Sequence, residues 1–210
     1  MERYLKIGTV NVKHNLFYHV LICILLVVMA PLFMGTENLE QNSVAKIIEI
    51  YLSLIGMILL IPTFIPDMNK DIRDLIYSKK EPVPVLHFIR VLEALVIMVV
   101  IGMLFLNYLK SGNCQFSFNK MFYTFMANGV FLGGLGMFMF AVFDQAVFAY
   151  MLPLVYYVLN FGAGKKQLGI FWLFSMQAGS IEEKHYLMGF GILFLVGAVV
   201  IVKCKTLCRR

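Results

Sequence analysis

The chain alternates long apolar stretches with short polar segments. Each stretch is close to the roughly 20 mainly apolar residues that a helix needs to cross the core of a bilayer. The pattern predicts an all-α integral membrane protein with a single transmembrane domain over residues 1–210. We expect the first stretch to stay as an uncleaved span, because it is longer than the core of a signal peptide and no A-x-A site follows it. The predicted spans are at about residues 16–33, 47–64, 86–109, 121–143, 146–161 and 186–202.

Composition and charge place this chain in the lipid bilayer and orient it. Hydrophobic residues make up 60% of the sequence and charged residues 14%, which excludes a disordered chain, a disulfide-stapled module and a free nucleic-acid binder despite a net charge of +6. With the N-terminus in the cytoplasm, 12 of the 18 Lys and Arg residues fall on the cytoplasmic side of six spans. Because Lys and Arg concentrate in cytoplasmic loops, we expect both termini inside the cell, at the plasma membrane.

The sequence contains no motif that would make the chain an enzyme by itself. It lacks the G-x-x-x-x-G-K-[ST] loop of ATPases, H-E-x-x-H and G-x-S-x-G. The closest histidine pair, His14 and His19, lies about 140° apart around a helix, so the two rings do not share a face that could bind a metal. We therefore expect no catalytic residue, metal or cofactor on this chain.

Four charged residues fall at predicted membrane boundaries, where burial is costly. Glu49 lies in the first turn of the second span, near its outer boundary. Arg90 and Glu93 begin the third span and are close enough to pair, and Asp144 lies in the two-residue connection between the fourth and fifth spans. At these depths we expect the side chains to cap helices or to extend to the interface.

The segment between the fifth and sixth spans contains a second apolar patch, residues 168–174, that is too short to cross the bilayer. Flanking glycines and Trp172 favour an outer re-entrant hairpin or interfacial helix, and an ordinary loop with an apolar patch is the alternative. Glu182 and Glu183, which follow, are expected to be solvated.

Small and aromatic residues distinguish the fourth span. Gly129 and Gly133 form a G-x-x-x-G pattern that lets another helix approach closely, either within this chain or across a subunit interface. The fourth and fifth spans are also rich in Phe and Met, which would suit an adaptable apolar lining or simply face lipid. These residues are Phe122, Phe125, Met126, Phe131, Met137, Phe138, Met139, Phe140, Phe143 and Phe148.

The cytoplasmic stretch PDMNKDIRDLIYSKKEPVP, at 66–84, has the pattern of a short amphipathic helix. Asp67 is placed to cap it, and Pro82 and Pro84 end it. Its apolar positions recur at helical spacing, so one face can rest on the membrane bundle. The charged face would then be presented to the cytoplasm, where a soluble partner can bind.

Taken together, this amphipathic segment, six spans with both termini inside, the short Asp144–Gln145 connection and the outer segment resemble the permease subunit of type-2 ABC exporters. The resemblance covers nearly the whole chain and is architectural. It implies that the segment is a coupling helix that binds a separate ATPase subunit. The contact residues that it implies are Asp67, Asp71, Arg73, Asp74, Leu75 and Tyr77.

The resemblance also implies a function and partners. Two permease subunits, identical or sister chains, would form the pathway, and ATP and Mg would bind to the partner ATPase subunits. An amphipathic peptide or lipid-like cargo suits the apolar spans. A non-transporting membrane subunit that binds a peptide or protein partner, as in immunity, is the alternative from another functional class.

Overall fold

The computed structural model of the chain describes residues 8–68 and 83–208 and is helical in six long stretches. The prediction of six helices long and apolar enough to cross a membrane is confirmed. Their bounds are Gly8–Met34, Gln41–Thr63, Val85–Ser111, Phe118–Phe143, Ala146–Phe171 and Glu182–Lys205. Each of these stretches overlaps one predicted span. Several begin earlier than predicted, because polar first turns continue the helix beyond the apolar run.

The stretches comprise helices joined by tighter or wider helical turns. The first contains the π-helical turn η1 (Val12–Leu16) and α2 (Phe17–Met34), and the third is α6 (Val83–Ser111). The second is α3 (Gln41–Ile47), the π-helical turn η2 (Ile48–Leu52), α4 (Ser53–Leu60) and the 3-10 turn η3 (Ile61–Thr63), followed by η4 (Ile65–Met68). The remaining elements are α7 (Phe118–Phe143), α8 (Ala146–Leu168), the 3-10 turns η5 (Gly169–Phe171) and η6 (Ser175–Ala178), and α9 (Glu182–Cys208).

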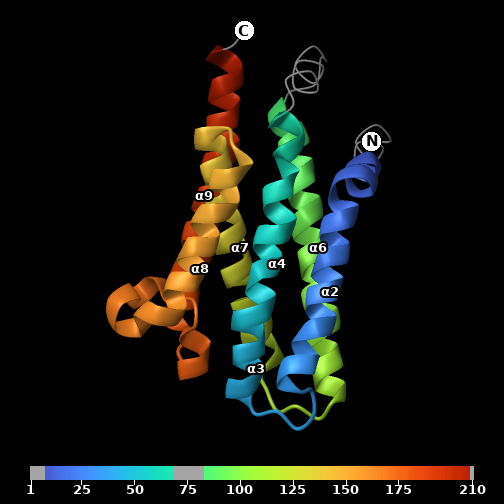
Figure 1. Ribbon diagram of the computed structural model, residues 1–210, viewed down its shortest axis with the longest axis vertical. Coiled ribbons are helices and arrows are strands. Elements are labelled where there is room, and N and C mark those ends of the chain that lie inside the picture. Colours follow the sequence, from blue (N-terminus) through green and yellow to red (C-terminus); the bar gives the residue numbers. More distant parts are fainter. Residues whose placement is uncertain (1–7, 69–82, 209–210) are drawn as a thin grey trace.

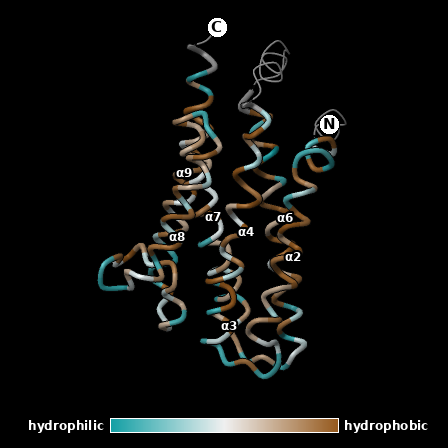
Figure 2. Tube along the Cα trace, viewed as in Figure 1, coloured by the Kyte–Doolittle hydropathy of each residue, from teal (hydrophilic) through white to brown (hydrophobic). Residues whose placement is uncertain are grey.

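The helices run side by side, and the two ends of the described chain lie at the same end of the bundle (Figure 1). We call this the terminal end. The connections after α2 and after α6 lie at the opposite end, and polar residues gather near both ends, with apolar residues between them (Figure 2). The bundle thus has the hydropathy profile of a membrane protein whose helices cross the bilayer repeatedly.

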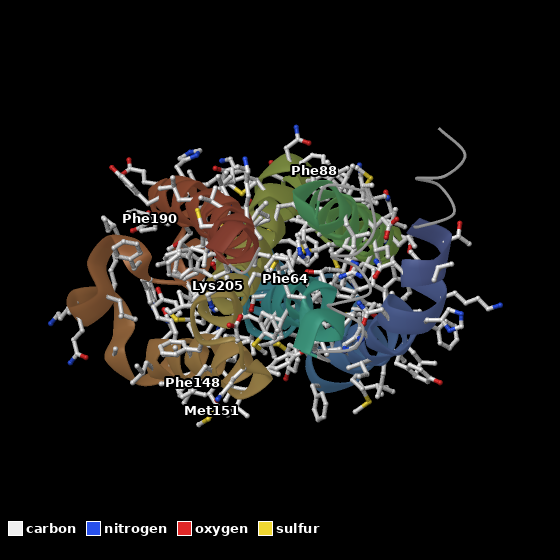
Figure 3. The ribbon with its side chains drawn as sticks, turned by 90° about the horizontal axis from the view of Figure 1, so that it is seen from above. Phe64, Phe88, Phe148, Met151, Phe190 and Lys205 are labelled. Atoms are coloured by element: carbon white, nitrogen blue, oxygen red, sulfur yellow. The ribbon has the colours of Figure 1, made fainter. Side chains whose placement is uncertain are left out.

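Helices α4 and α7 form the centre of the bundle. In each of the two spans that contain them, 72% of an 18-residue apolar stretch is buried. The corresponding share is 17% in the span of α2 and 22% in the spans of α8 and α9. Viewed along the bundle, Phe64 lies among the helices, whereas Phe148, Met151 and Phe190 lie at the outside (Figure 3). The outer helices therefore offer wide apolar faces to lipid or to another membrane protein.

Glycines bring the backbones of the central helices together. A Cβ added to Gly56 of α4 would lie 2.0 Å from the carbonyl oxygen of Gly129 in α7, and one added to Gly133 would lie 2.4 Å from Leu60. On the other side of α7, a Cβ on Gly134 would lie 2.6 Å from the carbonyl oxygen of Gly191 in α9. Gly129 and Gly133 thus pack within the chain, because any side chain at these contacts would separate the helices.

Of the nine Phe and Met residues singled out in the fourth span, four are buried in the interior and four are half-buried. Phe125 and Met137 are fully buried, and Phe131 and Phe140 are each 4% exposed. They fill the space between helices, so they neither face lipid nor line an open path in this structure. Phe143 and Phe148, at the junction of α7 and α8, are exposed.

Candidate functional site

A buried ion pair joins the second and sixth spans near the opposite end of the bundle. The Nζ atom of Lys184 lies 2.6 Å from Oε1 of Glu49, and both side chains are fully buried. Glu49 lies eight residues into its span, about 12 Å along the helix axis. Charges at such a position are costly unless they are paired, so an ion pair there marks a candidate functional site.

Each ion also binds the backbone of the segment that connects α8 to α9. The carboxylate of Glu49 accepts hydrogen bonds from the backbone N–H groups of Met176 at 2.9 Å and Gln177 at 3.1 Å. The ammonium of Lys184 donates to the backbone carbonyl of Leu173. The pair therefore satisfies its own charges and, at the same time, holds two points of residues 169–181.

Two asparagines complete this cluster. Asn128 of α7 accepts a hydrogen bond from Nζ of Lys184 at 2.9 Å and donates to the carbonyl of Leu173 at 3.1 Å. Asn160 of α8 accepts the backbone N–H of Leu173 at 2.8 Å and donates to the carbonyl of Tyr156 at 2.7 Å. Both backbone groups of Leu173 are thus bound by side chains from neighbouring helices. We call Glu49, Lys184, Asn128 and Asn160 the polar cluster.

Local structure explains how these residues reach one position. Glu49 lies in the π-helical turn Ile48–Leu52, and such turns recur at functional sites because they shift the side chains that follow. Lys184 lies in the first turn of α9, where its side chain points into the bundle at the level of Asn128. The prediction that Glu183 is solvated is wrong: it is 7% exposed, accepts a hydrogen bond from Ser180 and pairs with Lys165 at 2.9 Å.

The chemistry of the polar cluster is suited to holding backbone groups. Its two charges cancel, and its amides bridge neighbouring groups, so it has the donors and acceptors to fix a segment. Within residues 8–68 and 83–208, no group of three His, Cys, Asp or Glu side chains is placed to hold a metal ion.

A second set of polar contacts lies at the terminal end. Nδ2 of Asn11 lies 2.8 Å from Oε2 of Glu93, and Nδ2 of Asn15 donates to the carbonyl of Pro62 at 2.9 Å. Arg90 donates to the carbonyl of Thr63 at 3.3 Å. These bonds tie the first helix and the start of α6 to the end of the second span.

The predicted boundary charges fall at both ends of the molecule. Glu49 does not extend to the interface, since it is fully buried, and Arg90 is 9% exposed. Asp144, in the turn between α7 and α8, pairs with Lys205 of α9 at 3.0 Å; Lys205 is labelled in Figure 3. Whether Arg90 and Glu93 pair with each other stays a prediction.

The predicted coupling residues fall mainly where the structure is not described. Asp71, Arg73, Asp74, Leu75 and Tyr77 lie outside the described residues. Asp67 lies in the 3-10 turn Ile65–Met68 that precedes them. Their role therefore stays a prediction.

Sequence reasoning missed Lys184, Asn128 and Asn160 as members of a site. In the predicted orientation Lys184 counts as a charge on the outer side, and the predicted site residues include neither asparagine. A signal was present, because Asn128 and Asn160 are strongly polar residues inside or at the end of apolar stretches. The sequence alone does not show that the fold brings these positions together near Glu49.

Comparisons with known proteins give no relative. No family model matches the chain, and no curated protein and no solved structure matches it significantly.

Proposed function

We propose that the chain is the transmembrane subunit of an ATP-driven exporter of the ABC type. With a second permease subunit, the same or a sister chain, it forms a pathway across the plasma membrane for an amphipathic peptide or lipid-like cargo. Separate ATPase subunits bind ATP and Mg and drive the transport. Both termini lie in the cytoplasm, and residues 169–181 enter the membrane from the outer side without crossing it.

One observation carries the proposal: the place where the segment 69–82 is attached. The turn η4 before it, the start of α6 after it and both ends of the described chain lie at the terminal end of the bundle (Figure 1). This is the end that the charge distribution assigns to the cytoplasm. The charged amphipathic stretch PDMNKDIRDLIYSKKEPVP, residues 66–84, includes the segment 69–82, and its attachment at that end supports binding to a cytoplasmic ATPase.

The exposed apolar faces support a partner within the membrane. Large side chains along α8, such as Val147, Met151 and Leu154, are 48–61% exposed, and those along α2 are similarly exposed. Lipid alone can cover such faces, and so can a second copy of this bundle. A pathway shared by two bundles is consistent with the dense centre of each one, where α4 and α7 are packed through glycines.

The test is purification of the tagged full chain from its native membrane in mild detergent, with ATP hydrolysis measured on what co-purifies. We expect an ATPase subunit with a P-loop to co-purify with the tagged chain. In the Arg73→Glu variant the ATPase should no longer co-purify, although the tagged chain itself still folds. Lys80→Glu is the matched control, because it reverses one positive charge outside the proposed contact set. If no ATPase co-purifies, the exporter proposal is wrong and a non-transporting role in binding a peptide or protein takes its place.

A further inference from the structure

We propose that residues 169–181 form a lid against the side of the bundle, near its opposite end, and that the ion pair of Glu49 and Lys184 is the latch that holds it closed. The role of this lid in cargo exit rests on the proposed function. The lid itself rests only on the contacts described above. No charged side chain from the lid enters this latch, which acts on the lid's backbone alone.

The first argument is that the lid can leave without stranding a charge. If residues 173–177 move away, Glu49 and Lys184 still face each other at 2.6 Å, and Lys184 still faces the amide oxygen of Asn128 at 2.9 Å. Opening then breaks hydrogen bonds to neutral backbone groups and leaves the ions paired. A buried charge that lost its only partner would make opening far more costly.

The second argument is that glycines flank the lid in backbone conformations that favour glycine. Gly169 has φ of 53° at its start and Gly179 has φ of 78° near its end, and a Cβ at either position would meet nothing within 4 Å. Hinges consist of a few residues, often small ones, that absorb large changes in the backbone dihedral angles φ and ψ. In Figure 1 this segment folds back beside α8 as a separate excursion from the bundle.

The third argument is that the closed position leaves two polar atoms of the lid unsatisfied. The hydroxyl of Ser175, which is fully buried, and the indole N–H of Trp172 have no hydrogen-bond partner among the described residues. Buried polar atoms without partners favour any position in which they gain one. The latch and aromatic packing, including Phe174 against Phe161, therefore favour the closed position of the lid. The two unsatisfied polar atoms favour an open position.

The experiment measures how accessible position 175, which lies in the lid, is to a polar reagent. Ser175→Cys is introduced into the full chain with Cys114, Cys204 and Cys208 replaced by Ser, and the protein is placed in nanodiscs. A polar maleimide is added, and labelling of positions 175 and 23 is followed by mass spectrometry of the two peptides. Cys23, which is fully buried in α2, reports unfolding of the whole bundle in the same sample.

We expect Glu49→Gln and Lys184→Met each to raise the labelling rate at position 175 by about tenfold, which corresponds to a loss of about 1.4 kcal/mol in the free energy of closing. Labelling of Cys23 should stay well below labelling of position 175, because position 23 becomes accessible only when the bundle unfolds. Glu37→Gln and Lys166→Met are matched controls, because they remove exposed charges of the same sign, in the connection that follows α2 and in the last turn of α8. They should leave both rates within about twofold.

Two results would overturn the lid. In the first, neither latch variant changes labelling at position 175, which would mean that the ion pair does not hold the segment. In the second, positions 175 and 23 are labelled at the same rate in the latch variants, which would mean that position 175 becomes accessible only when the whole bundle unfolds. The assay needs no ATPase subunit, so it separates failure of the lid from failure of the exporter proposal.

Discussion

The ion pair between Glu49 and Lys184 should contribute strongly to the stability of the folded chain. At 2.6 Å, two unit charges attract by roughly 6 kcal/mol with an effective dielectric constant of 20, and desolvation offsets much of this. Removing one partner of a buried pair costs about 3–5 kcal/mol, because the other charge is left uncompensated. For Lys184→Met we expect about 3 kcal/mol, since Glu49 keeps two backbone N–H donors.

A double-mutant cycle isolates the contribution of this pair. Glu49→Gln and Lys184→Met are made singly and together, and the free energy of unfolding is measured by circular dichroism during titration of the protein with SDS. The double variant should lose only about 1–2 kcal/mol, because no charge is left buried, giving a coupling energy of about 2 kcal/mol or more. A coupling energy below about 0.5 kcal/mol would refute the reasoning, since such a value is typical of exposed pairs.

A charge swap tests whether the pair stabilises the chain only because its charges cancel, or also because each ion binds particular backbone groups. Glu49→Lys combined with Lys184→Glu keeps the pair neutral, yet it places an ammonium against the N–H groups of Met176 and Gln177 and a carboxylate against the carbonyl of Leu173. We expect the swapped chain to be less stable than the neutral double variant. Equal or greater stability would show that only the cancellation of charge matters.

Two further predictions concern packing and orientation. Gly56→Ala should destabilise the chain by about 2 kcal/mol or more, because its Cβ would lie 2.0 Å from the carbonyl oxygen of Gly129, whereas Gly162→Ala, with nothing within 4 Å, should be neutral or stabilising in the same SDS titration. For orientation, Lys110→Cys in a Cys114→Ser chain should react with an impermeant maleimide in intact cells, and a fluorescent protein fused to the C-terminus should fluoresce; protection of position 110 together with a dark fusion would reverse the assignment.

The sequence predicts the spans well because the signal for them is local. About 20 consecutive apolar residues identify a membrane helix whatever it packs against, so all six overlap their predicted positions. The pattern of Gly129 and Gly133 likewise indicates close packing. It does not identify the partner, because Gly56 belongs to another helix and only the fold brings the two backbones together.

The polar cluster could not be predicted in the same way, because it depends on contacts between distant positions. The sequence predicts Glu49 in the first turn of the second span, whereas the helix begins eight residues earlier, at Gln41. The burial of Glu49 follows from partners such as Met176, which is 127 positions away. Hydropathy treats Lys184 as a charge at the start of a helix, the place where solvation is usual. Only the packing of α9 against α7 turns its side chain into the bundle.

The second span connects the two polar regions of the molecule. Glu49 lies near one end of it, and the carbonyls of Pro62 and Thr63, which bind Asn15 and Arg90, lie at the other, about 21 Å away along the helix axis. Between them, the backbone of α4 packs closely against α7 at Gly56, so we expect this helix to shift together with the core. A movement of the core relative to α6 and the first helix would therefore displace Glu49 as well. In the proposed exporter, this would give the point where the segment 69–82 is attached a direct mechanical connection to the latch.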